Sequence, residues 1–571
     1  MHIADEDRER GFRFGPLDRK GLIAGWRSGQ LVSLAVGVLI AVWVLSSSPS
    51  IQGVLFGIFC ISCSLVFAVW PIKAKTSEQW LPVVLGWVFA TIVKRSRWSS
   101  PLPLEGRLAL IDRFVGSGNG DSGSSAVRGC RGGSQRASKL RIERPKLAVN
   151  GSATTLAKLK PSKLWPSPFS MLSRCTVLGL PLESKGAPVG VVIDPYMHTC
   201  SAVLRARGSG FMLKSDAEQY ETVSRWGRVL ASAAQQGRGI YRLQWLVRSY
   251  PNPTNTLSCH LQSKRVISPT SPQALAYEDL IAGAEKDVLC NNTLLVISLR
   301  LPSNFFARYR QGENRSLVLV QKALLQEVFA LSADLNGADI AVERALSPVE
   351  LLSVVRQYMG DSRGMYPWGQ RGKNLEAGEP VSLLPDGDAG SSRFSDGPTL
   401  SMPMGARTSW SELKIDNTWH ATYWIAEWPR SPVPAEFLAP LLLETEVWKS
   451  VSIVMEPVPP IRAIRQIELQ RTASLADEEL KRRGGFLKTA RERLEKEMLA
   501  QKEAELAGGH GQYRFAGYIT VSGWSKEDLD RACTRIEHLA SQCFLEIRRM
   551  YGSQDTAFTY SLPLARGLSR K

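Results

Sequence analysis

Residues 28–72 read SGQLVSLAVGVLIAVWVLSSSPSIQGVLFGIFCISCSLVFAVWPI and contain no charged side chain. A break rich in serine, with one proline, at residues 46–50 divides this stretch into two apolar halves, 31–45 and 51–70. Each half approaches the roughly 20 residues that a helix needs to cross about 30 Å of hydrocarbon. The stretch therefore predicts a transmembrane helical hairpin. A pair of buried core helices and a signal peptide are the alternatives.

Lysine and arginine flank this hairpin on both sides and are absent from its central turn. Because cytoplasmic flanks of membrane helices are enriched in these residues, we expect an inner-membrane protein with both termini in the cytoplasm. Residues 1–27 would then form a cytoplasmic tail. The residues expected to anchor the hairpin at the membrane surface are Arg19, Lys20, Trp26, Arg27, Trp70, Lys73 and Lys75.

Residues 73–106 contain Trp80, Trp87 and Trp98 and become basic after residue 93. Tryptophan with a basic end is typical of a helix that lies in the lipid headgroup layer. Pro82 interrupts the apolar run, so we expect an interfacial amphipathic helix here, and a third crossing is the alternative.

Residues 107–163 are rich in glycine, serine and basic residues, a composition that buries too little apolar surface to fold alone. They predict a flexible basic linker. The net charge of +18 favours anionic lipid as a partner and, without sequence specificity, nucleic acid. The candidate basic contact surface consists of Arg128, Arg131, Arg136, Lys139, Arg141, Arg144 and Lys146.

Strand-like and helix-like segments alternate from residue 164 onward, which predicts an α+β protein. Residues 164–360 are expected to form a first cytoplasmic α/β domain. Its strands at 189–195, 199–205 and 240–247 surround a helix at 216–235, an order that resembles a ferredoxin-like split βαβ element. A helix at 348–359 is expected to begin with a capping box formed by Ser347 and Glu350.

A loop at residues 361–407 precedes a second cytoplasmic domain at 408–571. This domain is expected to contain a long charged helical hairpin at 464–506, broken at Gly484-Gly485. A strand at 513–522 and an amphipathic helix at 526–543 follow, and Ser525 is the expected cap of that helix.

The last third of the chain has a distinctive order of elements. A strand ends at Trp428-Pro429, and a second strand runs into residues 456–460. The charged helices, a strand at 515–521 and the closing stretch 557–564 follow. This arrangement resembles the N-terminal, non-motor domain of the conjugation ATPases of type IV secretion systems, of the TrbE and CagE type. The apolar hairpin with its basic flanks resembles the PrgI-like inner-membrane subunit of the same machines. The whole chain is thus similar to actinobacterial proteins that join such an anchor to an ATPase-like front domain.

The phosphate-binding loop and the zinc-binding motif of common enzymes do not occur in the sequence. There is no G-x-x-x-x-G-K-[ST] and no H-E-x-x-H, and residues 369–374 lack the spacing and the hydroxyl of a phosphate-binding loop. Asp194, His198 and Cys200 are interpreted as a turn aspartate, an exposed histidine and a half-buried cysteine. Cys60 and Cys63 have the C-x-x-C interval but are interpreted as small apolar fillers of the second membrane helix, and the other cysteines are spread singly. We therefore expect no catalytic, cofactor or metal site.

The leading hypothesis is a non-enzymatic, membrane-anchored structural component of a secretion or conjugative DNA-transfer apparatus. The resemblance implies that it docks a separate ATPase and other inner-membrane subunits at the cytoplasmic face. One alternative is a membrane component of a type VII system that resembles EccE. The other is a membrane-tethered nucleic-acid-binding protein that uses the basic linker.

Overall fold

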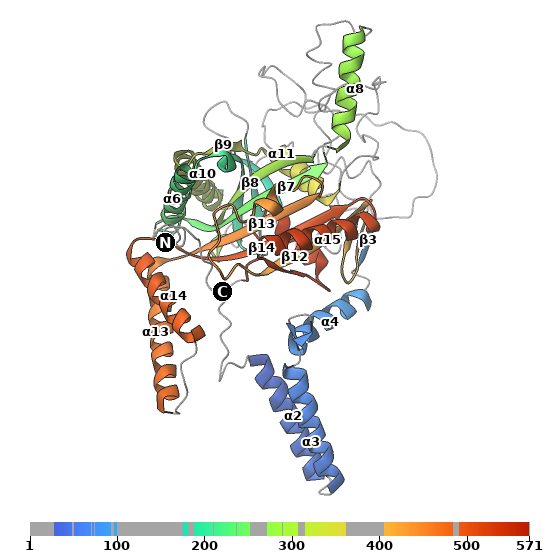
Figure 1. Ribbon diagram of the computed structural model, residues 1–571, viewed down its shortest axis with the longest axis vertical. Coiled ribbons are helices and arrows are strands. Elements are labelled where there is room, and N and C mark those ends of the chain that lie inside the picture. Colours follow the sequence, from blue (N-terminus) through green and yellow to red (C-terminus); the bar gives the residue numbers. More distant parts are fainter. Residues whose placement is uncertain are drawn as a thin grey trace, which may run out of the picture.

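Within its described residues the chain is an α+β protein, in which helices pack on one large antiparallel sheet (Figure 1). The α+β class predicted from the sequence is confirmed. The apolar N-terminal helices extend away from the sheet at one end of the molecule (Figure 1). The computed structural model describes residues 28–47, 51–69, 71–72, 75–92, 96–99, 175–180, 188–208, 210–235, 237–251, 271–287, 289–306, 314–360, 405–483 and 490–569.

Thirteen strands form the main sheet of the described part of the chain, and every pair of neighbours is antiparallel. Their order is β3-β10-β11-β12-β14-β13-β7-β8-β6-β5-β4, while β15 also pairs with β12 and β9 with β6. The strands are β3 (Arg97–Ser99), β4 (Thr176–Leu180), β5 (Val189–Asp194), β6 (Thr199–Gly208), β7 (Ile240–Pro251), β8 (Leu289–Arg300), β9 (Ile340–Ala345), β10 (Gly405–Thr408), β11 (Leu413–Ile415), β12 (Thr418–Glu427), β13 (Lys449–Val458), β14 (Gln512–Gly523) and β15 (Glu546–Arg549).

Helices connect these strands and also precede them. A separate pair of short strands, β1 (Pro71–Ile72) and β2 (Lys75–Thr76), lies between α3 and α4. The helices are α2 (Ser28–Ser47), α3 (Ile51–Val69), α4 (Ser77–Ile92), η5 (Phe211–Leu213), α6 (Asp216–Ala233), α8 (Pro272–Asp287), α10 (Asn314–Gly337), α11 (Pro348–Met359), α12 (Ala439–Leu442), α13 (Pro460–Arg483), α14 (Ala490–Ala507), α15 (Lys526–Gln542), α16 (Gln554–Phe558) and η6 (Thr559–Ser561).

The two halves of the sheet repeat one connectivity. In the first half, β6, α6, β7, β8, α10 and β9 follow one another, and the strands lie in the order β9-β6-β8-β7. In the second half, β12, α12, β13, β14, α15 and β15 follow one another, in the order β15-β12-β14-β13. Helices are inserted at the same point of both halves, α8 between β7 and β8, and α13 with α14 between β13 and β14.

Strands β7 and β13 join the two halves. Their register runs from Ser249↔Lys449 to Leu243↔Met455. The sequence assigns the halves to separate domains at 164–360 and 408–571, because residues 361–407 have the composition of a loop. The sheet nevertheless continues from one half into the other. Strands β7 and β13 are the open edges of the two halves, and each supplies hydrogen-bonding partners for the backbone of the other. Residues 361–404 lie outside the described residues.

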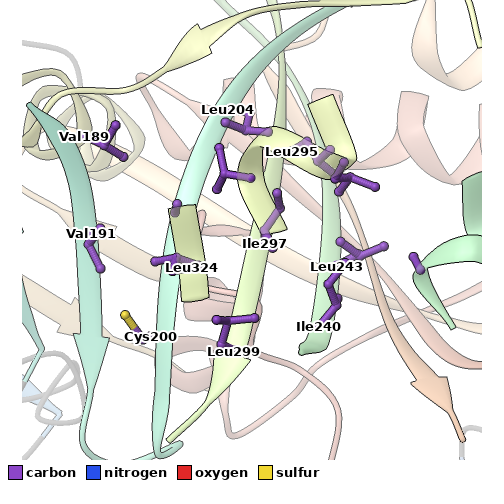
Figure 2. Packing of buried hydrophobic residues seen from close by; sticks show 14 of the residues in the cluster. Val189, Val191, Cys200, Leu204, Ile240, Leu243, Leu295, Ile297, Leu299 and Leu324 are labelled. Atoms are coloured by element: carbon purple, nitrogen blue, oxygen red, sulfur yellow. The ribbon is translucent and has the colours of Figure 1, made fainter. Parts of the chain in front are cut away.

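One face of the sheet is covered by helices. In the first half, Leu243 and Ile297 pack with Leu324 of α10 (Figure 2). In the second half, Val451 packs with Ile536 of α15. Paired residues of neighbouring strands point to the same side of a sheet, and Leu243 pairs with Met455. Met455 and Val451 are four positions apart on β13, so their side chains also point to the same side. The helices of both halves therefore cover the same face.

The opposite face is covered by α11 and by the C-terminal segment, residues 554–569. Leu246 of β7 belongs to an apolar cluster with Leu351 of α11 and Phe558 of α16. Polar side chains such as Gln244 and Thr520 are also buried on this face. It therefore holds the polar contacts that are described below.

Capping side chains define where three helices begin. In each, a serine accepts the N–H of the third helical residue, and the carboxylate of that residue accepts the N–H of the serine, which satisfies two otherwise unpaired donors. The capping box at Ser347 and the cap at Ser525 are confirmed. The pairs are Ser215 with Glu218, Ser347 with Glu350 and Ser525 with Asp528.

Candidate functional site

The helices α2 and α3 expose large apolar side chains over much of their surface. Leu39, Trp43 and Phe59 are 67%, 69% and 62% exposed. The helices pack on each other through small residues, because a Cβ on Gly37 would lie 2.4 Å from the Cβ of Ser64. An apolar surface of this extent is stable in lipid and unfavourable in water.

Within the described ranges, the segment Gln30–Ser47 is the one helix that is long and apolar enough to cross a membrane. The apolar parts of α3 and α4, Ile51–Val66 and Trp80–Ile92, are shorter. Two membrane crossings were expected from the sequence. Helix length supports one crossing, by α2. A signal sequence has a similar apolar core.

The expected basic flanks are placed only in part. Lys75 lies in β2, and its partner in the register is Ile72. The basic contact surface within residues 128–146 lies outside the described residues. So do Arg19, Lys20, Trp26, Arg27, Trp70 and Lys73.

Helix α4 packs through aromatic side chains on the main sheet and its connecting loops, which we call the sheet domain. The rings of Trp80 and Trp87 lie 5.9 and 5.3 Å from the ring of Trp410, which follows β10. Tyr551 closes the cluster, with ring centroids 6.2 Å from Trp80 and 6.3 Å from Trp410. Offset and edge-to-face pairs at these distances contribute about 0.5–1.5 kcal/mol each beyond the burial of their area.

Gly552 allows this close approach. Its φ of +72° is a conformation that glycine adopts without strain, and its N–H donates to the carbonyl of Trp410 at 2.7 Å. A Cβ at this position would lie 2.7 Å from the Trp410 ring and 2.8 Å from Val83 of α4. A larger residue would therefore separate α4 from the sheet domain.

The other side of α4 is apolar and exposed. Leu81, Leu85, Phe89 and Ile92 follow one another at helical spacing and are 50%, 59%, 60% and 73% exposed. The helix thus has one face on the protein and one unoccupied apolar face. Its tryptophans, which the sequence assigns to the lipid headgroup layer, pack on the protein at Trp80 and Trp87.

The chain after α4 enters the main sheet. Strand β3 pairs with β10, with Trp98 opposite Ala406. The N–H of Thr408 donates to the carbonyl of Ser96 at 2.8 Å. Contacts at both ends of the segment therefore connect the apolar helices to the sheet domain.

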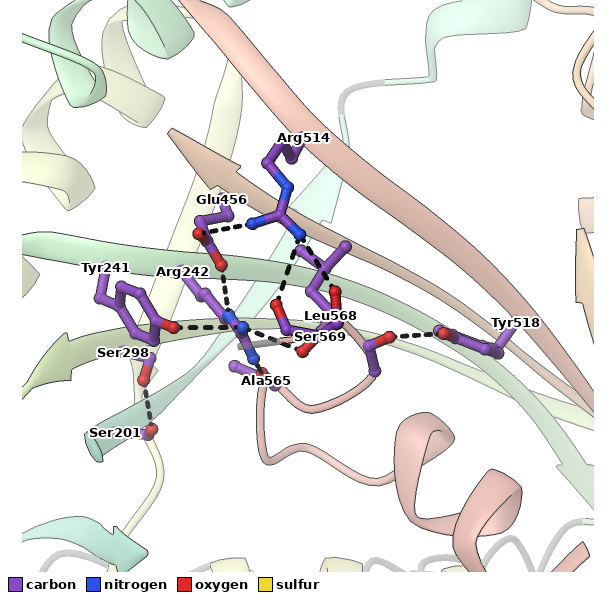
Figure 3. Close-up of polar contacts among 11 residues, drawn as sticks. Ser201, Tyr241, Arg242, Ser298, Glu456, Arg514, Tyr518, Ala565, Leu568 and Ser569 are labelled. Carbon is purple, nitrogen blue, oxygen red and sulfur yellow. Dashed lines mark hydrogen bonds and ion pairs between the residues drawn. The ribbon is translucent and has the colours of Figure 1, made fainter. Parts of the chain in front are cut away.

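The C-terminal segment crosses the junction of the two halves and is bound by Arg242 of β7 (Figure 3). The Arg242 side chain is fully buried; its Nε donates to Glu456 at 2.9 Å and its Nη2 to the carbonyl of Leu568 at 3.0 Å. Glu456, on β13, also accepts from Arg514 of β14 at 3.1 Å. One carboxylate therefore pairs with two guanidinium groups, and the carbonyls of the segment, together with the Tyr241 hydroxyl, accept the other hydrogen bonds of Arg242.

Gln244 and Tyr518 bind the same segment. The Gln244 amide donates to the carbonyl of Leu562 at 2.9 Å and accepts from the N–H of Ala565 at 2.8 Å. The Tyr518 hydroxyl donates to the carbonyl of Gly567 at 2.6 Å. We call residues 554–569, bound by Arg242, Gln244 and Tyr518, the C-terminal clasp.

A buried ion pair connects the clasp to the first half. Arg566 lies 2.6 Å from Asp194, and the side chains are 2% and 3% exposed. Asp194 also accepts the backbone N–H groups of Tyr196 and Met197, at 2.9 and 3.1 Å. The aspartate was predicted only as a turn residue, and it is in addition the partner of a buried arginine.

The neighbours of Asp194 differ from their predicted environments. Cys200 is 1% exposed instead of half-buried, because its strand β6 lies between β5 and β8. Burial raises the pKa of its thiol to about 12, so it is un-ionised near neutral pH. His198 is partly buried, with its ring 5.4 Å from that of Phe306.

His420 lies in a buried polar group on the same face as the clasp. Its ring nitrogens are 3.0 Å from Thr418 Oγ1 and 2.8 Å from Ser522 Oγ, and Phe558 packs against the ring. Burial and, secondarily, the charge of Arg248 lower the pKa of His420 to about 3. The histidine is therefore neutral in the folded protein.

The chain matches no protein-family profile and no curated protein sequence.

The residues that bind α4 and the clasp were not singled out in the sequence. A signal for the clasp exists in β7, where Arg242, Gln244 and Arg248 lie at even-numbered positions, and so on one face, of a strand that is rich in apolar residues. A periodic polar face on a central strand indicates buried partners. No comparable signal exists for Trp410 or Tyr551, whose partners in α4 are more than 300 residues away along the chain.

We predict that Trp410→Ala releases α4 without unfolding the sheet. The substitution removes three ring contacts, so amide exchange within α4 should rise by about tenfold or more while exchange in β14 is unchanged. Hydrogen-exchange mass spectrometry of the full chain in detergent measures both. Tyr220→Ala, which removes an aromatic ring that is 63% exposed on α6, is the control. Equal exchange of α4 in both variants would contradict the contact.

We predict that Arg566→Met destabilises the protein by about 3–5 kcal/mol, because it leaves the Asp194 carboxylate buried without its partner. Adding Asp194→Asn should recover much of this loss, since the amide oxygen still accepts the turn N–H groups. Denaturant unfolding measures the difference. Arg531→Met is the matched control, because Arg531 is 80% exposed in its ion pair and should cost no more than about 1 kcal/mol.

We predict that His420 contributes to acid sensitivity. Its folded pKa lies below its unfolded value, so between pH 6.5 and about 3 the unfolded state binds a proton that the folded state does not, and stability falls as the pH falls. His420→Asn should lose less thermal stability between about pH 7.5 and about pH 5 than the wild type. Identical losses in calorimetry would show that His420 plays no part.

Proposed function

We propose that this chain is a membrane-anchored structural component of a secretion or conjugative DNA-transfer apparatus, and that it binds a separate ATPase at the cytoplasmic face. It acts as a mount and performs no catalysis of its own. The single observation that carries the proposal is the position of α4, which binds the sheet domain on one face and presents an apolar face on the other. With this arrangement α4 would connect the sheet domain to the bilayer that holds the apolar helices.

The proposed topology is a two-helix anchor with both termini in the cytoplasm. Helix α3 is 19 residues long and uncharged, and its contacts with α2 through Gly37 and Gly57 suit two helices that enter the bilayer together. The basic residues on both sides of the pair favour this orientation. Helix α4 would then lie along the cytoplasmic surface, with Leu81, Leu85 and Phe89 in the lipid.

The proposed body consists of two ferredoxin-like units. Each half has the strand order expected of that arrangement, and each carries a helical insertion between its second and third strands. The insertion α13–α14 projects from the sheet and exposes Ile461, Ile464, Leu469 and Leu475 at 50–72% (Figure 1). Exposed apolar residues on a projecting helix suit a contact with a partner protein.

Purification of the full chain from membranes in mild detergent and low salt tests this function. We expect an ATPase with a phosphate-binding loop to co-purify, and Ile464→Glu/Leu475→Glu to reduce its recovery. Leu213→Glu, at a site that is 93% exposed on η5, is the matched control. The proposal fails if no ATPase or other secretion subunit is recovered. Recovery of type VII subunits would instead favour the EccE-like alternative.

A further inference from the structure

Three basic side chains lie next to one another on neighbouring strands of the sheet. Arg97 of β3 is opposite Arg407 of β10, and Arg407 is in turn opposite Lys414 of β11. Residues directly opposite each other on antiparallel strands point to the same face, with their Cβ atoms about 5 Å apart. Arg97 and Arg407 are exposed, and Lys414 is partly buried. We call these three residues the basic strip.

Acidic side chains do not neutralise the basic strip within the described part of the chain. Glu412, just before β11, pairs with Lys526 at 3.4 Å. Asp416, just after β11, pairs with Arg356 at 3.1 Å. The exposed Glu527, in the first turn of α15, forms no ion pair with the strip. The three positive charges are therefore uncompensated among the described residues.

The stability of the sheet does not account for the basic strip. Like charges directly opposite each other on neighbouring strands are destabilising, and the strip contains two such pairs. A charge on an edge strand prevents pairing with other chains, which accounts for Arg97 on β3. Arg407 and Lys414 lie on inner strands, and the one compensating contact there places Lys414 Nζ 4.9 Å from the centroid of the Trp419 ring. An anion across the strip would offset the repulsion.

The basic strip lies close to the exposed apolar face of α4. Four residues separate the end of α4 at Ile92 from Arg97, and this connection spans no more than about 18 Å. Trp410, on which α4 packs, lies in the turn between β10 and β11, the strands that carry the other two cations. Figure 1 shows α4 between the sheet and the helices α2 and α3, with β3 directly beyond it. The same local contacts therefore hold the apolar face and the strip.

We propose that the basic strip binds the phosphate groups of anionic lipids in the membrane that holds α2. Each lysine or arginine close to an anionic membrane raises binding about fivefold, so three raise it on the order of a hundredfold, and high salt screens the effect. The same cations would attract nucleic acid, but their position next to α4 favours lipid. The contact would orient the sheet domain against the bilayer. This inference rests on the anchoring that is proposed above.

The test measures how fast phenylglyoxal, an arginine reagent, modifies Arg97 and Arg407 in the full chain held in lipid nanodiscs. Discs of phosphatidylcholine are compared with discs that contain about one-third phosphatidylglycerol. Peptide mass spectrometry follows each site. We expect both arginines to react about tenfold more slowly in the anionic discs, and high salt to remove the difference. Arg430, which is 83% exposed beyond the other end of β12, should react equally in both.

Arg407→Gln/Lys414→Gln should reduce the protection of Arg97 to about twofold or less. This variant should keep its melting temperature in detergent, because it removes both like-charge pairs. Arg97→Gln gives the reciprocal measurement at Arg407. Arg462→Gln/Arg465→Gln, which removes the same charge at exposed positions of α13, should retain the protection. Equal rates in both kinds of disc, or protection that survives high salt or Arg407→Gln/Lys414→Gln unchanged, overturns the proposal.

Recovery of the chain with the discs separates this inference from the proposed function. A chain that elutes with neither kind of disc is not anchored, and both proposals then fail. A chain that enters both kinds of disc but shows no protection is anchored without the lipid contact, and only this inference fails. Protection that requires added single-stranded DNA, and not anionic lipid, would assign the basic strip to nucleic acid and overturn the lipid contact.

Discussion

The ladder between β7 and β13 imposes the main constraint on this structure. It places the open edges of two similar units against each other, and it also places Arg242, Gln244 and Glu456 on the face of the sheet that no helix of those units covers. Buried polar groups need hydrogen-bonding partners. The C-terminal clasp supplies them with its carbonyl and N–H groups, so the joining of the halves and the binding of the clasp are physically dependent on each other.

The clasp draws its contacts from both halves. Arg566 pairs with Asp194 at the end of β5, while Tyr518 of β14 binds the carbonyl of Gly567. A buried pair of opposite charges stabilises little against apolar residues of the same size, but it strongly disfavours any arrangement in which one partner is missing. The interaction therefore selects one relative position of the clasp and the two halves of the sheet.

The same sheet is connected to the apolar helices by α4 and β3. Aromatic packing on Trp410 and strand pairing with β10 act on successive parts of one segment, so directional contacts, and not a free linker, connect α4 to the sheet. The two insertions, α8 and α13–α14, occupy equivalent points of the repeated units and project to opposite sides. One repeated architecture thereby presents different surfaces on the side of α2 and α3 and on the opposite side.

The sequence by itself determined the features that depend on neighbouring residues. The uncharged run at 28–72, the alternation of strands and helices, and the caps at Ser347 and Ser525 follow from local composition and spacing. The burial of Cys200 and the second role of Asp194 did not follow, because they depend on partners elsewhere in the fold. The tertiary structure alone brought Trp410 to α4, Arg566 to Asp194 and β7 to β13. The physical reason is that these contacts join residues hundreds of positions apart, and a sequence pattern reports only the face that a side chain occupies, never its distant neighbour.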